Sequence, residues 1–292
     1  MQLLINALIA GSLAALLASG LSLVYGILRV FNLALGQTVL IGGYVAWWLF
    51  DGMHLPMLVT ILGGIGAGAL VSWLTYDVFV KPFYRRHPHL TLVTTIALGM
   101  MLDALILLVF EERPRSIQLT WGRTLEFGGM IIGVPQLFLV ITTLVLLCLF
   151  AFLLHSTAFG RRIRAVAQQD TAAMSLGVDA PSLHRLILIM SGVLAACGGI
   201  FIAIDQNLSP TLAFPLTIKA YAAVTAGGMG NVWGTILCAY LIALLEQLVV
   251  GVHWFGAFYV PAGFQATVPL LFIIIFLLFK PTGLFLRASR AA

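Results

Sequence analysis

Residues 160–177 have the sequence GRRIRAVAQQDTAAMSLG and separate two long apolar runs, 134–155 and 184–205. The apolar side chains of this basic segment recur at helical spacing, at Ile163, Val166, Ala167 and Met174. That spacing predicts a short helix with one apolar face. Each flanking run is long enough to cross a bilayer, for which about 20 apolar residues suffice. The pattern therefore predicts an all-α protein whose spans are joined here by a basic amphipathic connection.

The end of this connection carries its own signals. Gly177 favours the left-handed conformation that ends many helices. Asp179 is suited to cap the helix that follows, with Pro181 in its first turn. A basic amphipathic helix at a membrane face is commonly an interfacial segment. A glycine-bounded, alanine-rich helix between two spans also has a shape that fits a groove on a partner protein.

The whole chain is strongly apolar. Of its 292 residues, 61% are hydrophobic and only 9% are charged, against roughly 25% charged residues in soluble domains. Its mean hydropathy is +1.09. This composition excludes a water-soluble enzyme and a nucleic-acid-binding domain despite the net charge of +5. The three cysteines lie inside apolar runs without metal-like spacing, so we expect packing roles and no metal site.

The apolar stretches predict a polytopic membrane protein with about eight or nine transmembrane helices in a single domain, residues 1–292. The stretches fall near 3–25, 38–50, 56–80, 90–110, 134–155, 184–205, 214–226, 232–252 and 262–280. Two of them, 38–50 and 214–226, are too short to cross as straight helices and are predicted to be broken or re-entrant. A Gly-rich sequence accompanies each, and such corresponding broken segments point to inverted repeats with a transport path between them. The glycines would also serve close helix packing.

Basic residues predict the orientation. Eleven of the 15 fall in alternate connections or the C-terminal tail: Arg29, Lys81, Arg85, Arg86, Arg161, Arg162, Arg164, Arg185, Lys280, Arg287 and Arg290. The positive-inside rule places these in the cytoplasm, with the N-terminus outside and the C-terminus cytoplasmic. This requires 214–226 to cross, since a re-entrant segment would leave the basic tail outside. The connection 111–133 is expected to be a solvated outer loop that could also offer charge to an external partner.

Four motifs occur in order along the chain, and together they resemble those of branched-chain amino acid permeases of the LivH type. The first is Asn32-Leu33-Ala34-Leu35-Gly36-Gln37, running on to Gly42-Gly43-Tyr44. The second, Gly160-Arg161…Ala165…Asp170…Ala173…Gly177, is similar to the cytoplasmic coupling segment of ABC-importer membrane subunits. The others are Lys219-Ala220 with Gly227-Gly228-Met229-Gly230-Asn231-Val232-Trp233-Gly234, and Lys280-Pro281-Thr282-Gly283.

The resemblance implies a non-enzymatic permease subunit of an ABC importer in the bacterial inner membrane, for branched-chain amino acids or a similar small solute. Its implied partners are a second permease chain, related or identical, two cytoplasmic ATPases and an external solute-binding protein. The coupling segment, 157–183, would contact the ATPases through Gly160, Arg161, Ala165, Asp170, Ala173 and Gly177. This chain would bind no cofactor, with ATP used by its partners, and its sequence has no Gly-x-x-x-x-Gly-Lys-Ser/Thr phosphate loop.

We expect the substrate path beside the two broken segments, at Asn32, Gly36, Gln37, Gly227, Gly228, Gly230 and Asn231. The chain departs from the family pattern at two places. Many members carry a polar residue and an acid where this chain has Leu35 and Gln37, and Asp103 stands where an apolar or amide residue is expected. The solute therefore stays open, because permeases for urea and short amides share much of the pattern.

Four carboxylates lie in or near spans: Asp77, Asp103, Asp205 and Glu246. A charge at the bilayer centre costs at least ~2.5–3.5 kcal/mol, so each should face protein or water. We expect each to pair with a polar neighbour. In a proton-coupled secondary transporter, the first alternative, Asp103 or Glu246 would instead relay protons. A passive channel for a small polar solute such as urea is the second alternative.

Overall fold

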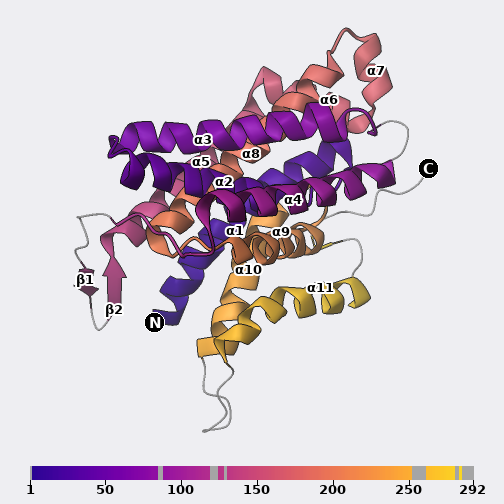
Figure 1. Ribbon diagram of the computed structural model, residues 1–292. Coiled ribbons are helices and arrows are strands. Elements are labelled where there is room, and N and C mark those ends of the chain that lie inside the picture. Colours follow the sequence, from indigo (N-terminus) through magenta and orange to yellow (C-terminus); the bar gives the residue numbers. More distant parts are fainter. Residues whose placement is uncertain are drawn as a thin grey trace.

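The structure is a computed structural model that describes residues 2–84, 88–118, 124–127, 130–251, 261–279 and 283–284. Long helices dominate it (Figure 1). Among the described residues, six helices are long and apolar enough to cross a membrane. They are α1 (Gln2–Leu28), α3 (Met57–Leu74) with its π-helical continuation η2 (Thr75–Val80), α4 (Pro88–Phe110), α5 (Val134–Ser156), α8 (Ala180–Asp205) and α10 (Val232–Gly251).

The shorter apolar helices include the two segments predicted to be broken. α2 (Leu35–Trp47) continues into the π-helical turn η1 (Trp48–Gly52), and α9 (Ala213–Gly227) follows the 3-10 turn η3 (Pro210–Leu212). Near the C-terminus, η4 (Ala262–Ala266) leads into α11 (Thr267–Phe279). Every predicted apolar stretch is thus helical over nearly all of its described residues, which confirms the all-α polytopic membrane fold.

Some features used in the orientation argument lie outside the described residues. They are Arg85, Arg86, Lys280, Arg287 and Arg290, together with most of the motif at 280–283. The cytoplasmic C-terminus and the suggested inverted repeats stay predictions.

Helix α1 lies at the centre of the molecule and packs against α8, α9 and α10. In its membrane-length stretch 89% of the residues are buried, against 28% in α4 and α5. Small residues allow this close packing: Gly20 lies against Ser191 of α8, and Gly26 lies against Gly230. The outer helices α3, α4 and α5 leave many large apolar side chains exposed, as a surface facing lipid or another subunit requires.

Helices α2 and α8 approach each other closely at glycines. A Cβ atom built on Gly199 of α8 would lie 1.9 Å from the Val39 carbonyl oxygen of α2. A similar atom on Gly42 would lie 2.7 Å from Ala196. Only glycine permits these distances, so these glycines let α2 and α8 pack closely, as predicted.

The connection after α4 contains a short β-hairpin that was not predicted. Strands β1 (Thr124–Phe127) and β2 (Met130–Gly133) pair antiparallel, with Leu125 opposite Ile132. Gly128-Gly129 separates them in the sequence, which is a hairpin signal between two short β-prone segments. The preceding residues add a bridge between Arg115 and Leu208, so this connection is tied to the segment that follows α8.

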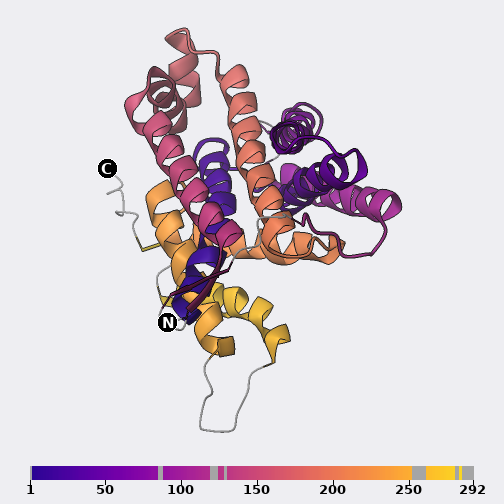
Figure 2. The same cartoon turned by 90° about the vertical axis from the view of Figure 1, so that its left-hand side faces the viewer.

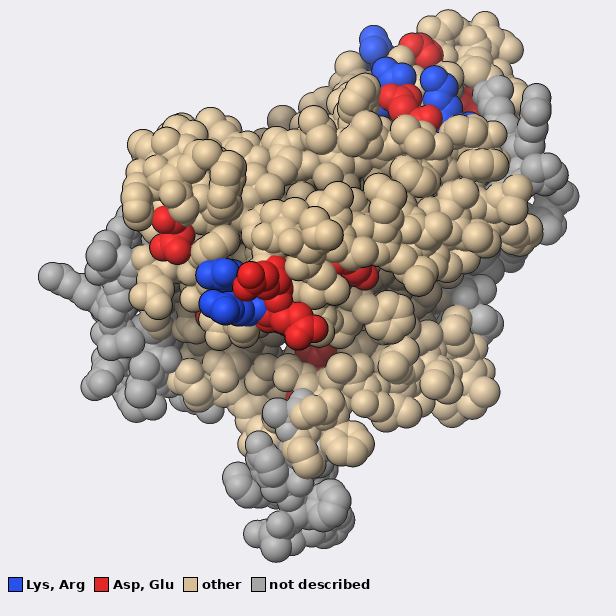
Figure 3. All heavy atoms as spheres, viewed as in Figure 1, with Lys and Arg blue, Asp and Glu red and all other residues tan. Residues whose placement is uncertain are grey.

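The helices place the hairpin and the basic connection at opposite ends. Figure 2 shows α6 (Ala158–Gln168) and α7 (Asp170–Ser175) beyond one end of α5 and α8, with the hairpin near the other end. Charged side chains on the face seen in Figure 3 gather in two groups, one over α6 and α7 and one towards the hairpin. The surface between them is nearly free of charge, as expected of a band in contact with hydrocarbon.

Candidate functional site

The break between α1 and α2 is held by hydrogen bonds to its free backbone groups. The Thr95 hydroxyl of α4 donates to the Phe31 carbonyl oxygen at 3.2 Å. Asn32 is buried, and its Oδ1 accepts from the Ala34 amide at 3.1 Å, closing a local turn. Asn32 therefore satisfies backbone groups of the break.

Gly36 and Gln37 follow this turn at the start of α2. The Gly36 amide donates to the Thr217 hydroxyl of α9 at 3.1 Å. A Cβ atom at Gly36 would lie 2.0 Å from the Ala213 carbonyl oxygen, so glycine is needed for α2 to meet α9. Gln37 is buried on the side facing α4, where its Nε2 donates to Asp103 Oδ2 at 3.0 Å. Gln37 and Asp103, which both depart from the family pattern, thus contact each other.

The second Gly-rich segment forms the turn between α9 and α10. Gly228 and Gly230 have φ values of 100° and 89°, a region in which other residues are strained. Asn231 Oδ1 accepts from the Gly234 amide at 3.3 Å and so caps α10. Gly230 and Asn231 also line a mostly apolar crevice of about 390 Å³ among α1, α5 and α6.

The structure does not bring the two Gly-rich segments together. Gly36 meets the start of α9, whereas 227–231 follows its end. From Thr217 to Gly228 is 11 residues, or roughly 16 Å along a helix. A path past both segments stays a prediction, and it would have to run along α9.

The predicted coupling segment forms two helices, α6 and α7, joined at Gln169. Arg161 and Ala165 are exposed, and their contact with a partner stays a prediction. Gly177 has φ 84° and follows α7, which confirms the left-handed stop. Leu176 beside it has 85% of its surface exposed, although sequence reasoning did not single it out. Such an exposed leucine is available for contact with a partner.

The other predicted coupling residues have structural contacts within the chain. A Cβ atom at Gly160 would lie 2.0 Å from the Leu154 carbonyl oxygen, so Gly160 permits the tight α5–α6 turn. Ala173 is buried, with 3% of its surface exposed. Asp170 is partly buried, and its Oδ1 lies 3.9 Å from His184 Nε2 of α8. These three residues shape the segment.

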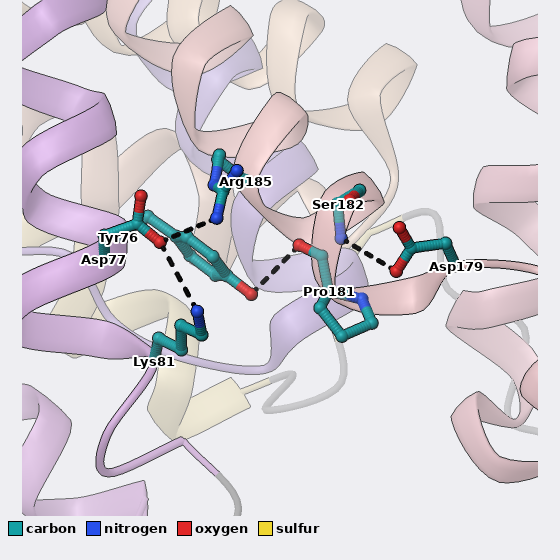
Figure 4. Close-up of polar contacts among 7 residues, drawn as sticks. All are labelled: Tyr76, Asp77, Lys81, Asp179, Pro181, Ser182 and Arg185. Atoms are coloured by element: carbon teal, nitrogen blue, oxygen red, sulfur yellow. Dashed lines mark hydrogen bonds and ion pairs between the residues drawn. The ribbon is translucent and has the colours of Figure 1, made fainter.

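Polar contacts attach the start of α8 to η2 at the base of this segment (Figure 4). Arg185 Nη2 donates to Asp77 Oδ1 at 3.0 Å, and the Tyr76 hydroxyl donates to the Pro181 carbonyl oxygen at 3.1 Å. Lys81 lies 3.8 Å from the same Asp77 oxygen. A displacement of α7 would therefore reach α3 as well as α8.

Asp179 caps α8, as predicted. Its Oδ1 accepts from the Ser182 amide at 3.3 Å. Hydrogen bonds from the Ser182 side chain, and secondly from its backbone amide, lower the pKa of the Asp179 carboxyl. The cap is accordingly present as a carboxylate at neutral pH.

All four carboxylates in or near spans have polar partners, which confirms that expectation. Besides Asp77 and Asp103, Asp205 Oδ1 accepts from Gln136 Nε2 at 3.0 Å. Glu246 of α10 forms an ion pair with Lys219 of α9, and both side chains are largely buried. Lys219 is one of the four basic residues not placed in the cytoplasm by the positive-inside rule, and it lies within α9. A single cation in an apolar helix could have indicated this buried pair.

Sequence reasoning also missed a polar cavity of about 390 Å³ at the hairpin end of the molecule. Its polar lining comes from α1, α5, α8, α9, α10 and η4, through Asn6, Gln136, Asp205, Lys219, Gln247 and Gln265, among others. Such a cavity among spans and a protruding segment at the opposite end are features of a transport protein.

The fold and these two sites define a polytopic membrane permease. Over residues 3–279 the chain matches the family described as the branched-chain amino acid transport system permease component. The protein belongs to this family, which confirms the resemblance seen in the motifs.

Two curated relatives cover nearly the whole chain. The high-affinity branched-chain amino acid transport system permease protein BraD of Pseudomonas aeruginosa is 25% identical over 97% of this chain and 95% of its own length. The high-affinity branched-chain amino acid transport system permease protein LivH of Escherichia coli is 25% identical over 97% of this chain and 94% of its own length. Among solved structures, PsaBC from Streptococcus pneumoniae in complex with a Fab has a similar fold, with a TM-score of 0.54 and 17% identity over 97% of this chain and 93% of that one.

Proposed function

We propose that this chain is a translocating subunit of an ABC importer in the bacterial inner membrane, for branched-chain amino acids or a chemically similar small solute. It would pair with a second permease chain, receive the solute from an external binding protein, and respond to two cytoplasmic ATPases. Family membership supports the class, and both full-length relatives carry branched-chain amino acid transport in their names.

The observation that carries the ATPase contact is the exposed face of α6 and α7. Buried Ile163, Val166 and Ala173 hold the two helices onto the chain, while Arg161, Ala165 and Leu176 project away from it. A large exposed apolar side chain on a protruding segment that also carries exposed basic residues is typical of a protein interface. Contacts through Asp77 and Arg185 would pass a movement of this face to α3 and α8.

The test replaces Leu176 with Asp, because this residue touches little of its own chain. A carboxylate at a packed interface loses the apolar contact and adds a desolvation cost, so ATPase subunits should dissociate and ATP-dependent uptake should fall at least about 10-fold. Met53→Asp is the matched control, since Met53 is also exposed and directly follows η1, outside the coupling segment. Both variants should reach the membrane in normal amounts.

The measurement is copurification of the ATPase with the tagged permease, together with leucine uptake in proteoliposomes that contain the whole complex. Normal copurification of the Leu176→Asp variant would show that α7 is only an interfacial segment. Uptake that needs a proton gradient but no ATP would favour the secondary transporter, and uptake that needs neither would favour the channel.

A further inference from the structure

The polar cavity at the hairpin end lies where a solute would enter. Gln136 begins α5, which ends next to α6, and Asp205 ends α8, which begins after α7. The cavity is therefore separated from the coupling segment by the full length of two spans. If α6 and α7 face the cytoplasm, as proposed above, the cavity is on the side to which an external binding protein delivers its solute.

The cavity carries charges of both signs. Asp205 accepts from Gln136 at 3.0 Å and from Gln206 at 3.5 Å, which leaves part of its acceptor capacity open, since a carboxylate has about four lone-pair sites. Lys219 pairs with Glu246, but its ammonium has three donors. Each charged group can thus bind a ligand while it keeps its partner in the protein.

Amide side chains and an apolar wall complete the lining. Gln247 of α10 and Gln265 of η4 offer donors and acceptors, while Ile9 and Leu13 of α1 and Leu216 of α9 are apolar. A volume of about 390 Å³ falls within the range of roughly 300–1,000 Å³ usual for small-molecule sites. The cavity is amphipathic, with one cation and one carboxylate beside a hydrophobic wall.

We propose that this cavity binds an amino acid zwitterion with an apolar side chain, its carboxylate on Lys219 and its ammonium on Asp205. The proposal rests on the proposed import function and assigns it a site. Counting Lys219, Glu246 and Asp205, the cluster has a formal charge of −1, which disfavours an anion. A neutral solute such as urea can hydrogen-bond to Lys219 and Asp205 but forms no ion pair with either, so it gains less from this pair of charges than a zwitterion does.

The first experiment measures ATP-dependent leucine uptake by the whole complex with its binding protein. Asp205→Asn should lower uptake about 10-fold or more, because it removes a charge-assisted hydrogen bond to the ammonium. Asn can still accept from Gln136, so the fold should be kept. Asp51→Asn is the matched control, because Asp51 is exposed in η1 and does not line the cavity.

The two failures are distinguishable. If the unaltered complex does not import leucine with ATP, the proposed function fails. If it does, and Asp205→Asn imports leucine within 2-fold of normal, the site is overturned while the function stands.

The second experiment tests the ligand chemistry through protection of a cysteine. Gln247→Cys, in a chain whose exposed Cys148 is replaced by serine, should react with a small polar thiol reagent added from outside. Leucine should slow this labelling at least 10-fold better than leucinamide, which lacks the carboxylate, or 4-methylpentanoate, which lacks the ammonium. Gln265→Cys serves if the first variant does not assemble, and Met53→Cys should be labelled without protection.

Equal protection by leucine and either analogue, or by urea, would overturn the zwitterion assignment. Labelling that leucine does not change at all would overturn the site itself.

Discussion

The ion pair between Lys219 and Glu246 should contribute to stability only as a pair. It joins α9 to α10, with 16% of the lysine side chain and 3% of the glutamate side chain exposed. Glu246→Gln leaves a buried ammonium without its counter-charge, and Lys219→Met leaves a buried carboxylate. Removing one partner of a buried pair costs about 3–5 kcal/mol. The double variant buries no charge, so it should be within about 1 kcal/mol of the unaltered protein.

The assay is the temperature at which the detergent-purified protein loses its monodisperse elution peak. At roughly 2 °C per kcal/mol for a chain of this size, each single variant should lose about 6–10 °C. The double variant should recover most of that loss. Glu112→Gln is the control, since Glu112 is exposed at the hairpin end, and it should change the temperature by less than 1 °C or so.

Additive effects, with the double variant as unstable as the sum of the singles, would refute the reasoning, because the two charges would then not compensate each other. Single variants indistinguishable from the control would refute it as well.

Three further outcomes are expected. Gly36→Ala should destabilise the protein by about 1–3 kcal/mol through overpacking against Ala213. Gly66→Ala, whose Cβ would meet nothing within 4 Å, should instead stabilise α3 by roughly 0.5–1 kcal/mol. Thermal unfolding of the two variants measures this difference, and equal effects would contradict the packing argument. Because folding lowers the pKa of Asp179, its cap should stabilise the protein above the unfolded pKa and lose this effect as pH falls through the folded pKa. Asp179→Asn caps α8 without titrating, so its thermal stability should change less between neutral and acidic pH. The same pH dependence of stability in both proteins would argue against this cap. Reporter fusions at Gln169 and after Arg290 should report cytoplasm and one at Glu112 the outside, and an external Arg290 fusion would show that α9 does not cross.

The sequence predicted that the membrane carboxylates have polar partners, but it did not identify those partners. That carboxylates in a membrane need partners follows from the cost of a bare charge in lipid, so pairing was expected before any partner was known. The partners themselves are far apart in sequence: Gln37 and Asp103 are separated by 66 positions, and Gln136 and Asp205 by 69. No local periodicity relates such positions.

In the coupling segment, too, local features were predictable from the sequence and long-range packing was not. Its helical character, the stop at Gly177 and the cap at Asp179 are local, because each depends on residues within about four positions. The inward direction of Ala173 depends on contacts with the rest of the chain. The resemblance implies that Ala173 contacts the ATPase, which stays a prediction, whereas its burial within this chain is decided by packing.

The sequence by itself determined that the protein lies in a membrane, where its spans and two broken segments fall, and to which family it belongs. Hydropathy, helical period and motif order are properties of residues near one another in the chain, so they can be read without the fold. The hairpin was also readable around Gly128-Gly129, where the turn signal was overlooked. Tertiary structure alone decided that the two Gly-rich segments lie at different ends of α9 and that Lys219 meets Glu246. It likewise decided the polar cavity. Six separate elements supply that cavity's polar lining, and their mutual placement depends on how closely the helix backbones approach, as at Gly36 and Gly199.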